Sequence, residues 1–181
     1  IFYGCSNLQE FNGDFASEDG RCLIVDGELN SFASAGLTEY TIPDSVTSIG
    51  SMAFWDCTSL TSVTIPDSVT SIGDYAFRGC TSLTSVTIPD SVTFIGEWAF
   101  SDCTSLTSVY ITDIVAWCKI SFGDLESNPL YYAGNLYLNN ELVTDLIIPD
   151  SVTSIGDMAF LNCYSLTSVT IGNGVTSIGD D

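Results

Sequence analysis

Apolar residues recur along the chain at a fixed interval that organises the whole sequence. The segment LTSVTIPDSVTSIGDYAFRGCTS begins at Leu60, and a close copy begins at Leu83. Within the first copy, Val63 and Ile65 fall on one face of a strand, because strand side chains alternate with a period of two. A fixed period of about 20–50 residues is typical of repeat architectures. The pattern therefore predicts one short strand per repeat, stacked in parallel on its neighbours.

The rest of each repeat predicts a corner, an apolar back wall and a return. Pro66 ends the strand because proline has no N–H to donate to a ladder. Val69 and Ile72 are expected to point into the core, and Gly73 is expected to let the chain change direction. Residues 74–77 predict a short helical or 3₁₀ turn.

The strand pattern also locates two irregular coils. The strand pattern is LxxΦxΦ, where Φ is an apolar residue. Its first residue falls at seven places: Leu8, Leu37, Leu60, Leu83, Leu106, Val143 and Leu166. Most intervals are 23 residues, and the two longer ones place irregular coils at about residues 8–36 and 106–142.

Each irregular coil contains a hairpin signal. Asp26-Gly27 lies between strand-like residues of segment 22–32, and Asn139-Asn140 lies between those of segment 135–143. Both hairpins are expected to replace the back wall of their coil. Residues 113–120 start with an acidic residue and are apolar at helical spacing, which predicts a short helix on the convex side.

The complete motif LTSVTIPDSVTSIGxxAFxxCxS resembles the BspA-like (Treponema-type) leucine-rich repeat family, because IPxSV, SIG, AF and the cysteine all recur in phase. We expect a right-handed α/β leucine-rich repeat solenoid of 23-residue coils. Its parallel sheet would lie on the concave side, with short helical turns or hairpins on the convex side. Residues 1–181 are expected to form one solenoid that is a fragment of a longer array. The resemblance further implies a secreted or surface-anchored protein, in a family often involved in adhesion.

Composition narrows the possible functions. The chain has 23 acidic residues, 3 basic residues and no histidine, for a formal net charge of −20. So few cations exclude nucleic-acid binding by phosphate neutralisation. Without histidine, Ser-His-Asp and Cys-His mechanisms and most catalytic zinc sites are also excluded. No apolar run approaches the about 18 residues of a membrane helix. We therefore expect a chain that is not an enzyme, has no cofactor and does not insert into a membrane.

One cysteine position recurs through the repeats. It is occupied by Cys57, Cys80, Cys103 and Cys163, and Cys5 has the same surroundings. Stacked in register, these side chains would hold their Cβ vectors parallel, which disfavours disulfides. A metal or redox ladder is the alternative, but no CxxC motif or histidine partner is present. The sequence predicts a structural ladder of buried, free thiols.

Aspartates recur at the turn after each strand. Asp67, Asp90 and Asp113 share this position, and their mutual repulsion could be relieved by calcium, which prefers oxygen ligands. A single carboxylate per coil does not provide the converging oxygens of a tight site. Solvated turn aspartates are therefore the favoured interpretation, and no metal site is assigned.

The outward strand positions are mostly serine and threonine, with a few exceptions. Tyr110 replaces one hydroxyl residue of the strand that begins at Leu106. Asp145 and Ile147 replace both hydroxyl residues of the strand that begins at Val143. These three residues are expected to be neighbours in space and to form a ligand-binding patch. In the alternative, the long insertion between them folds over and buries them.

A second row of large side chains precedes each Ala-Phe pair. Tyr75 and Trp98 are expected to align with Met52 and Met158 in a ridge on the back of the solenoid. Packing between coils explains such a ridge, and a ligand role is the alternative.

These features favour a non-enzymatic protein-binding or adhesion module of a secreted or cell-surface protein. Its ligand would be a protein or cell-surface component, such as host extracellular matrix, bound on the concave sheet face. One alternative is a passive solenoid spacer that projects another domain from the surface. Another is a carboxylate-dependent glycan hydrolase.

Overall fold

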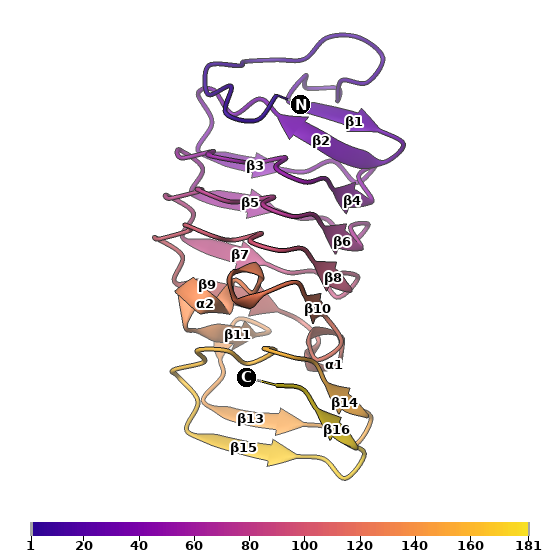
Figure 1. Cartoon of the computed structure of the whole chain (residues 1–181), viewed down its shortest axis with the longest axis vertical. Coiled ribbons are helices and arrows are strands. Elements are labelled where there is room, and N and C mark those ends of the chain that lie inside the picture. The colour runs from indigo at the N-terminus through magenta and orange to yellow at the C-terminus, as the bar shows by residue number, and fades with distance from the viewer. Residues whose placement is uncertain (1, 181) are drawn as a thin grey trace.

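The chain winds into a solenoid whose coils lie one on another along the long axis (Figure 1). This computed structural model describes residues 2–180. The solenoid has about seven turns. Equivalent residues of the regular coils are 23 positions apart, as in the 3.2 Å bond from Thr84 Oγ1 to the carbonyl oxygen of Thr61. The predicted leucine-rich repeat solenoid is therefore confirmed.

Six of the seven predicted strands form what we call the long-strand sheet, and the prediction of a strand beginning at Leu8 is wrong, because residues 8–13 form no strand. Its strands are β3 (Glu39–Thr41), β5 (Ser62–Thr64), β7 (Ser85–Thr87), β9 (Ser108–Ile111), β11 (Leu136–Leu138) and β12 (Glu141–Leu142), followed by a separate pair, β13 (Asp145–Ile148) and β15 (Ser168–Ile171). The regular strands pair in parallel, with Val63 opposite Val86 and Val86 opposite Val109. All three valines are buried. The shared register thus produces one apolar ladder inside the coils.

The back wall contains a second line of strands that the sequence pattern does not predict. This short-strand sheet consists of β1 (Cys22–Val25), β2 (Glu28–Phe32), β4 (Ser48–Ile49), β6 (Ser71–Ile72), β8 (Phe94–Ile95) and β10 (Ser121–Phe122), with β14 (Ser154–Ile155) and β16 (Ser177–Ile178) as a separate pair. Ile72 is fully buried, as predicted. Two-residue strands are too short to show the alternation by which strands are recognised.

A glycine follows each two-residue strand of the back wall, where the coils pack closely. A Cβ atom on Gly73 would lie 2.6 Å from the backbone nitrogen of Ser51 in the previous coil. The chain turns directly after Gly73, as expected, but the φ of Gly73 is not positive, so close packing and not a left-handed backbone requires glycine here.

The segment after each short strand turns, but not as a helix. Tyr75 and Phe77 donate their N–H groups to the carbonyl oxygens of Glu97 and Ala99 in the next coil, at 2.9 and 2.8 Å. An α-helix would need these N–H groups for bonds four residues back along the chain. Two residues in each turn adopt the left-handed region, and the first of them is Met52 (φ 61°), Tyr75 (φ 58°), Trp98 (φ 59°) or Met158 (φ 59°). The predicted helical turn at residues 74–77 is thus a non-helical turn bonded to the neighbouring coil.

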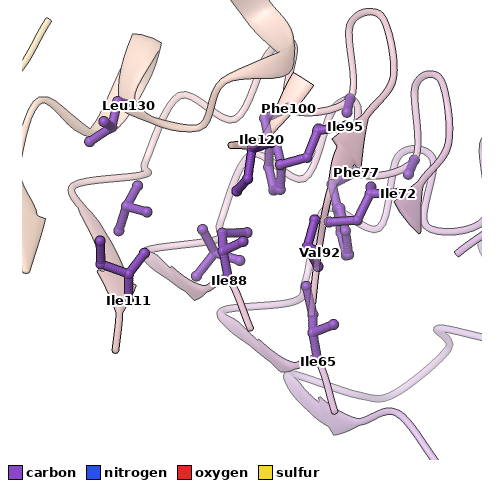
Figure 2. Close-up of a cluster of buried hydrophobic side chains, with 14 of the residues drawn as sticks. Ile65, Ile72, Phe77, Ile88, Val92, Ile95, Phe100, Ile111, Ile120 and Leu130 are labelled. Atoms are coloured by element: carbon purple, nitrogen blue, oxygen red, sulfur yellow. The ribbon is translucent and has the colours of Figure 1, made fainter. Parts of the chain in front are cut away.

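Phenylalanines stack through the core in the same way as the valines. Phe54, Phe77 and Phe100 are fully buried. Their ring centroids lie 4.9 and 5.2 Å apart, with interplanar angles of 14° and 10°. Figure 2 shows Phe77 and Phe100 beside Ile72 and Ile95 of their own coils. Three successive coils therefore add the same ring to one continuous aromatic stack.

The first irregular coil contains the predicted hairpin. Strands β1 and β2 are antiparallel, with Val25 opposite Glu28 across Asp26-Gly27. Both turn residues have positive φ (50° and 81°), as a type I′ turn requires. Strand β2 pairs with β4, so this hairpin begins the short-strand sheet, at the back wall where it was expected.

The second hairpin is also present, but in a different sheet from the one predicted. Strands β11 and β12 join across Asn139-Asn140, and β11 pairs in parallel with β9 of the long-strand sheet. The expectation that this hairpin replaces the back wall is therefore wrong. Leu136 and Leu138 continue the apolar register of Val109 and Ile111, which fixes β11 in the long-strand sheet.

The same coil contains the three helices of residues 2–180: α1 (Ile114–Trp117), η1 (Leu125–Ser127) and α2 (Leu130–Ala133). Helix α1 confirms the predicted helix. Asp113 caps it by accepting a 2.7 Å hydrogen bond from the Val115 N–H. Trp117 is buried, and its indole N–H donates to the Ala159 carbonyl oxygen at 2.7 Å, which ties this coil to a later one.

Candidate interaction surfaces

The regular part of the long-strand sheet presents small hydroxyls to solvent. On β5 and β7, the serines are half-buried and the threonines exposed, while the intervening valine is buried. Such side chains offer little apolar area, and binding energy concentrates in large aromatic and basic anchors. A recognition site on this face must therefore involve the residues that interrupt the hydroxyl pattern.

Tyr110 is the first interruption, and it has an aromatic partner. It lies opposite Tyr137 of β11, with ring centroids 4.7 Å apart and an interplanar angle of 26°. Both tyrosines are half-buried. Aromatic cross-strand pairs of this kind stabilise a sheet. Tyr137 was not among the predicted residues, since its role depends on which sheet receives β11.

Asp145 and Ile147 are the second interruption, on β13. They face solvent, whereas Leu146 and Ile148 face the core. Ile147 is 67% exposed, so the insertion does not cover it. Strand β11 lies between β9 and β13 (Figure 1), so the expectation that Tyr110 adjoins Ile147 is wrong. The insertion separates the two because it adds a strand of its own to the sheet.

The sheet is interrupted beyond β12. Strand β12 pairs with β11, and β13 pairs with β15, but among residues 2–180 no ladder joins β12 to β13. Between them lies a groove of about 340 Å³, which we call the sheet-break groove, lined by Leu138 and residues 141–147. Its volume is near the lower end of the roughly 300–1,000 Å³ of ligand pockets. Asp145 and Ile147 line this groove, and Tyr110 does not.

The groove is acidic. Asp145 accepts hydrogen bonds from the hydroxyls of Ser168 and Thr144, and these bonds lower the pKa of its carboxyl group. Glu141, at the other wall, is exposed. No lysine or arginine lines the groove. Two carboxylates without a basic neighbour favour a cationic group in the groove.

The predicted calcium candidates are separate carboxylates with structural contacts. Asp90 accepts hydrogen bonds from the Asp113 N–H at 3.1 Å and from Thr112 Oγ1 at 2.8 Å. Asp113 caps α1, and Asp67 is exposed. Throughout residues 2–180 there is no group of three or more acidic, cysteine or histidine residues arranged to hold a metal ion. Asp90 and Asp113 therefore accept hydrogen bonds from backbone N–H groups, Asp90 from the next coil and Asp113 from the start of α1.

The recurring cysteines of the regular coils are buried and unpaired. All seven cysteines are free, and Cys57, Cys80 and Cys103 are buried. The Cys103 thiol donates to the Phe77 carbonyl oxygen at 3.2 Å. Burial raises the pKa of Cys103 to about 12 and that of Cys80 well above its usual value. Neutral thiols are poor nucleophiles and metal ligands, which supports the structural interpretation.

The ends of this ladder differ from its middle. Cys163 is half-buried, as expected for a less covered coil, and the structural ladder includes it. Cys5 is exposed, so the expectation that it is buried is wrong. The chain before β1 forms turns at the edge of the solenoid, where no earlier coil among the described residues covers it.

The back of the solenoid contains the predicted aromatic ridge with two further members. Tyr75 and Trp98 stack at 6.3 Å with an interplanar angle of 16°. Trp55 lies 5.7 Å from Tyr75, and the Arg78 guanidinium lies 4.7 Å above the Trp55 ring. Trp55 and Arg78 occupy a repeat position that the sequence pattern does not single out. The ring faces contact one another and Arg78, which supports packing between coils as their role.

The last coil exposes residues that other coils bury. Val169, Ile171 and Ile178 are 52%, 47% and 60% exposed. Val63, Ile65 and Ile72, at the equivalent repeat positions, are buried. The apolar surface formed by Val169, Ile171 and Ile178 therefore corresponds to one that is buried between neighbouring coils elsewhere in the solenoid.

Several solved structures are similar to this one. A leucine-rich cell surface protein of Faecalibacterium prausnitzii A2-165 is 33% identical, with a TM-score of 0.54 over 92% of this chain and 45% of its own. A leucine-rich repeat protein of Bacteroides capillosus is 30% identical (TM-score 0.51; 61% of this chain, 85% of its own). One from Bacteroides ovatus is 28% identical (TM-score 0.53; 95% and 42%). This chain thus spans less than half of two of these proteins.

The repeats also match a family model. The BspA type leucine-rich repeat region matches in six copies, over residues 28–127 and 132–181. No curated protein matches the chain. Between residues 2 and 180, no helix is both long enough and apolar enough to span a bilayer. The match includes most of the sequence and agrees with the stacked coils, so the chain belongs to the BspA-type leucine-rich repeat family.

Proposed function

We propose that this chain is a non-enzymatic protein-binding or adhesion module of a secreted or cell-surface protein. Its ligand is a protein or cell-surface component that contacts the long-strand sheet around the sheet-break groove. The observation that supports this is the exposure of Ile147 (67%) beside Leu142 (42%), on a face otherwise made of small hydroxyls. Apolar residues surrounded by polar ones are typical of interaction sites.

Charge and family support the same function. The net charge of −20 favours partners with basic surfaces, because complementary potentials speed association and exclude acidic competitors. The similar protein of Faecalibacterium prausnitzii is described as a cell surface protein. Components of host extracellular matrix are partners of the kind proposed.

The proposal is tested by capture from an extracellular-matrix extract. The immobilised chain is compared with the double variant Tyr110→Ser plus Ile147→Thr, which restores the regular hydroxyl pattern. A matched control, Thr64→Ser plus Thr87→Ser, alters two regular strands. We expect the chain and the control to retain the same proteins and the double variant to lose them. Equal retention by all three would refute the binding surface.

A passive spacer is the second candidate function. It is favoured by the repeated bonding between the regular coils, such as the 3.1 Å bond from the Thr84 N–H to the Thr61 carbonyl oxygen, which stiffens that part of the solenoid. In the same experiment, absence of specific retention by every version, including the unaltered chain, would favour the spacer.

A further inference from the structure

The sheet-break groove exposes two strand edges. Strand β12 is paired only on the side of β11, and β13 only on the side of β15. By contrast, β5 has β3 on one side and β7 on the other. An unpaired edge presents free N–H and C=O groups that can pair with another chain. Within the described residues, the groove lies between two such edges.

The edge of β13 is long enough for a short added strand. It contains four residues, and at about 3.3 Å per residue it extends for roughly 13 Å. Its side chains alternate strictly, with Asp145 and Ile147 towards solvent. A segment that paired with this edge would place alternate side chains beside those two residues.

The chemistry of the groove defines the matching segment. Beside Asp145 the favoured residue is basic, since this carboxylate and that of Glu141 have no cationic neighbour in the groove. Beside Ile147 the favoured residue is apolar. The residue between them lies beside Leu146, which faces the core, and is also apolar.

We propose that the sheet-break groove binds an extended peptide segment of a partner protein as an added β-strand along β13. The segment has a lysine or arginine beside Asp145 and an apolar residue beside Ile147. This inference rests on the proposed function and specifies its partner: an exposed, basic and apolar strand or tail. Main-chain hydrogen bonds supply affinity in such complexes, and alternate side chains supply specificity.

The probe is a fluorescein-labelled peptide with the sequence Gly-Val-Val-Lys-Val-Val-Gly. Because this sequence reads the same in both directions, it fits a parallel or an antiparallel added strand. Its binding is followed by fluorescence anisotropy against two altered peptides. One replaces lysine by glutamate, and the other is N-methylated at alternate amides, which removes main-chain donors. We expect each alteration to weaken binding at least tenfold, and added salt to weaken the parent peptide.

Variants of the chain locate the site. Asp145→Ser plus Ile147→Thr introduces the residues that β15 has at these positions, so the fold should be retained, and binding should weaken at least tenfold. The matched control adds Ser62→Asp plus Thr64→Ile to that variant. It rebuilds both side chains on β5, whose two edges are already paired, and should not restore binding.

Three results would overturn strand addition. They are equal binding of the N-methylated peptide, restored binding in the β5 control, and no binding of the parent peptide at about 1 mM. None of these refutes the proposed function, which fails if capture from matrix extract is independent of the surface or if no version of the chain retains any protein specifically. The two proposals are therefore tested separately.

Discussion

Replacing Phe77 by alanine should remove a large part of the stability of the solenoid. The ring is fully buried and stacks on Phe54 at 4.9 Å and on Phe100 at 5.2 Å. Burial alone gives about 3–5 kcal/mol for such a truncation. Each aromatic contact adds roughly 0.5–1.5 kcal/mol. Because both neighbours are fixed by their own coils, the cavity cannot collapse, and we expect a loss of at least about 4 kcal/mol.

The measurement is equilibrium unfolding in urea, followed by circular dichroism. Phe94→Ala is the matched control, because Phe94 is 42% exposed and its truncation should cost less than about 1 kcal/mol. Total stabilities are commonly about 5–15 kcal/mol, so the Phe77→Ala variant should unfold at a much lower urea concentration. A loss below about 2 kcal/mol, or one equal to that of the control, would refute the reasoning from stacked rings.

Three further predictions concern the turns and the thiols. Asp74→Ala should lower the free energy of unfolding by about 1 kcal/mol, because the carboxylate accepts a 2.9 Å hydrogen bond from the Glu97 N–H. Asp67→Ala, which removes no such bond, is the control. An equal loss for both variants in urea unfolding would contradict the role of these bonds. Asp102→Gly should be more stable than Asp102→Ala by about 1 kcal/mol, because φ is 60° at this position and a Cβ atom disfavours this left-handed conformation. Equal thermal stability of the two variants would contradict this prediction. Stability should decrease above about pH 9, because the unfolded chain then releases thiol protons that Cys103 retains up to its pKa of about 12. Cys103→Ala should reduce this pH slope in urea titrations, and an unchanged slope would show that burial of this thiol does not contribute.

Repetition made much of the fold predictable. Leu60, Val63 and Ile65 could be assigned to the core because their spacing recurs with a constant register, and all three are buried. The Asp26-Gly27 turn and the Asp113 helix start were predictable because local backbone chemistry determines them. In each case the physical cause lies within a few residues of the feature.

Other features depend on contacts that only the assembled coils define. The short-strand sheet arises because neighbouring coils bring two-residue segments into register, which no single copy reveals. Tyr75 gives no local sign of its left-handed conformation, since glycine or asparagine would be expected there. The separation of Tyr110 from Ile147 depends on which sheet receives the hairpin at residues 136–142. Irregular coils lack the redundancy on which the prediction of the regular ones depends.

The most direct test of the account is amide hydrogen exchange with and without the lysine-containing peptide. Strand addition along β13 predicts slower exchange at residues 145–148, whose free edge becomes paired. Residues 62–64, in a strand already paired on both sides, should be unchanged. Protection confined to the aromatic ridge at residues 74–79, or to the exposed last coil, would contradict the assignment of the interaction surface.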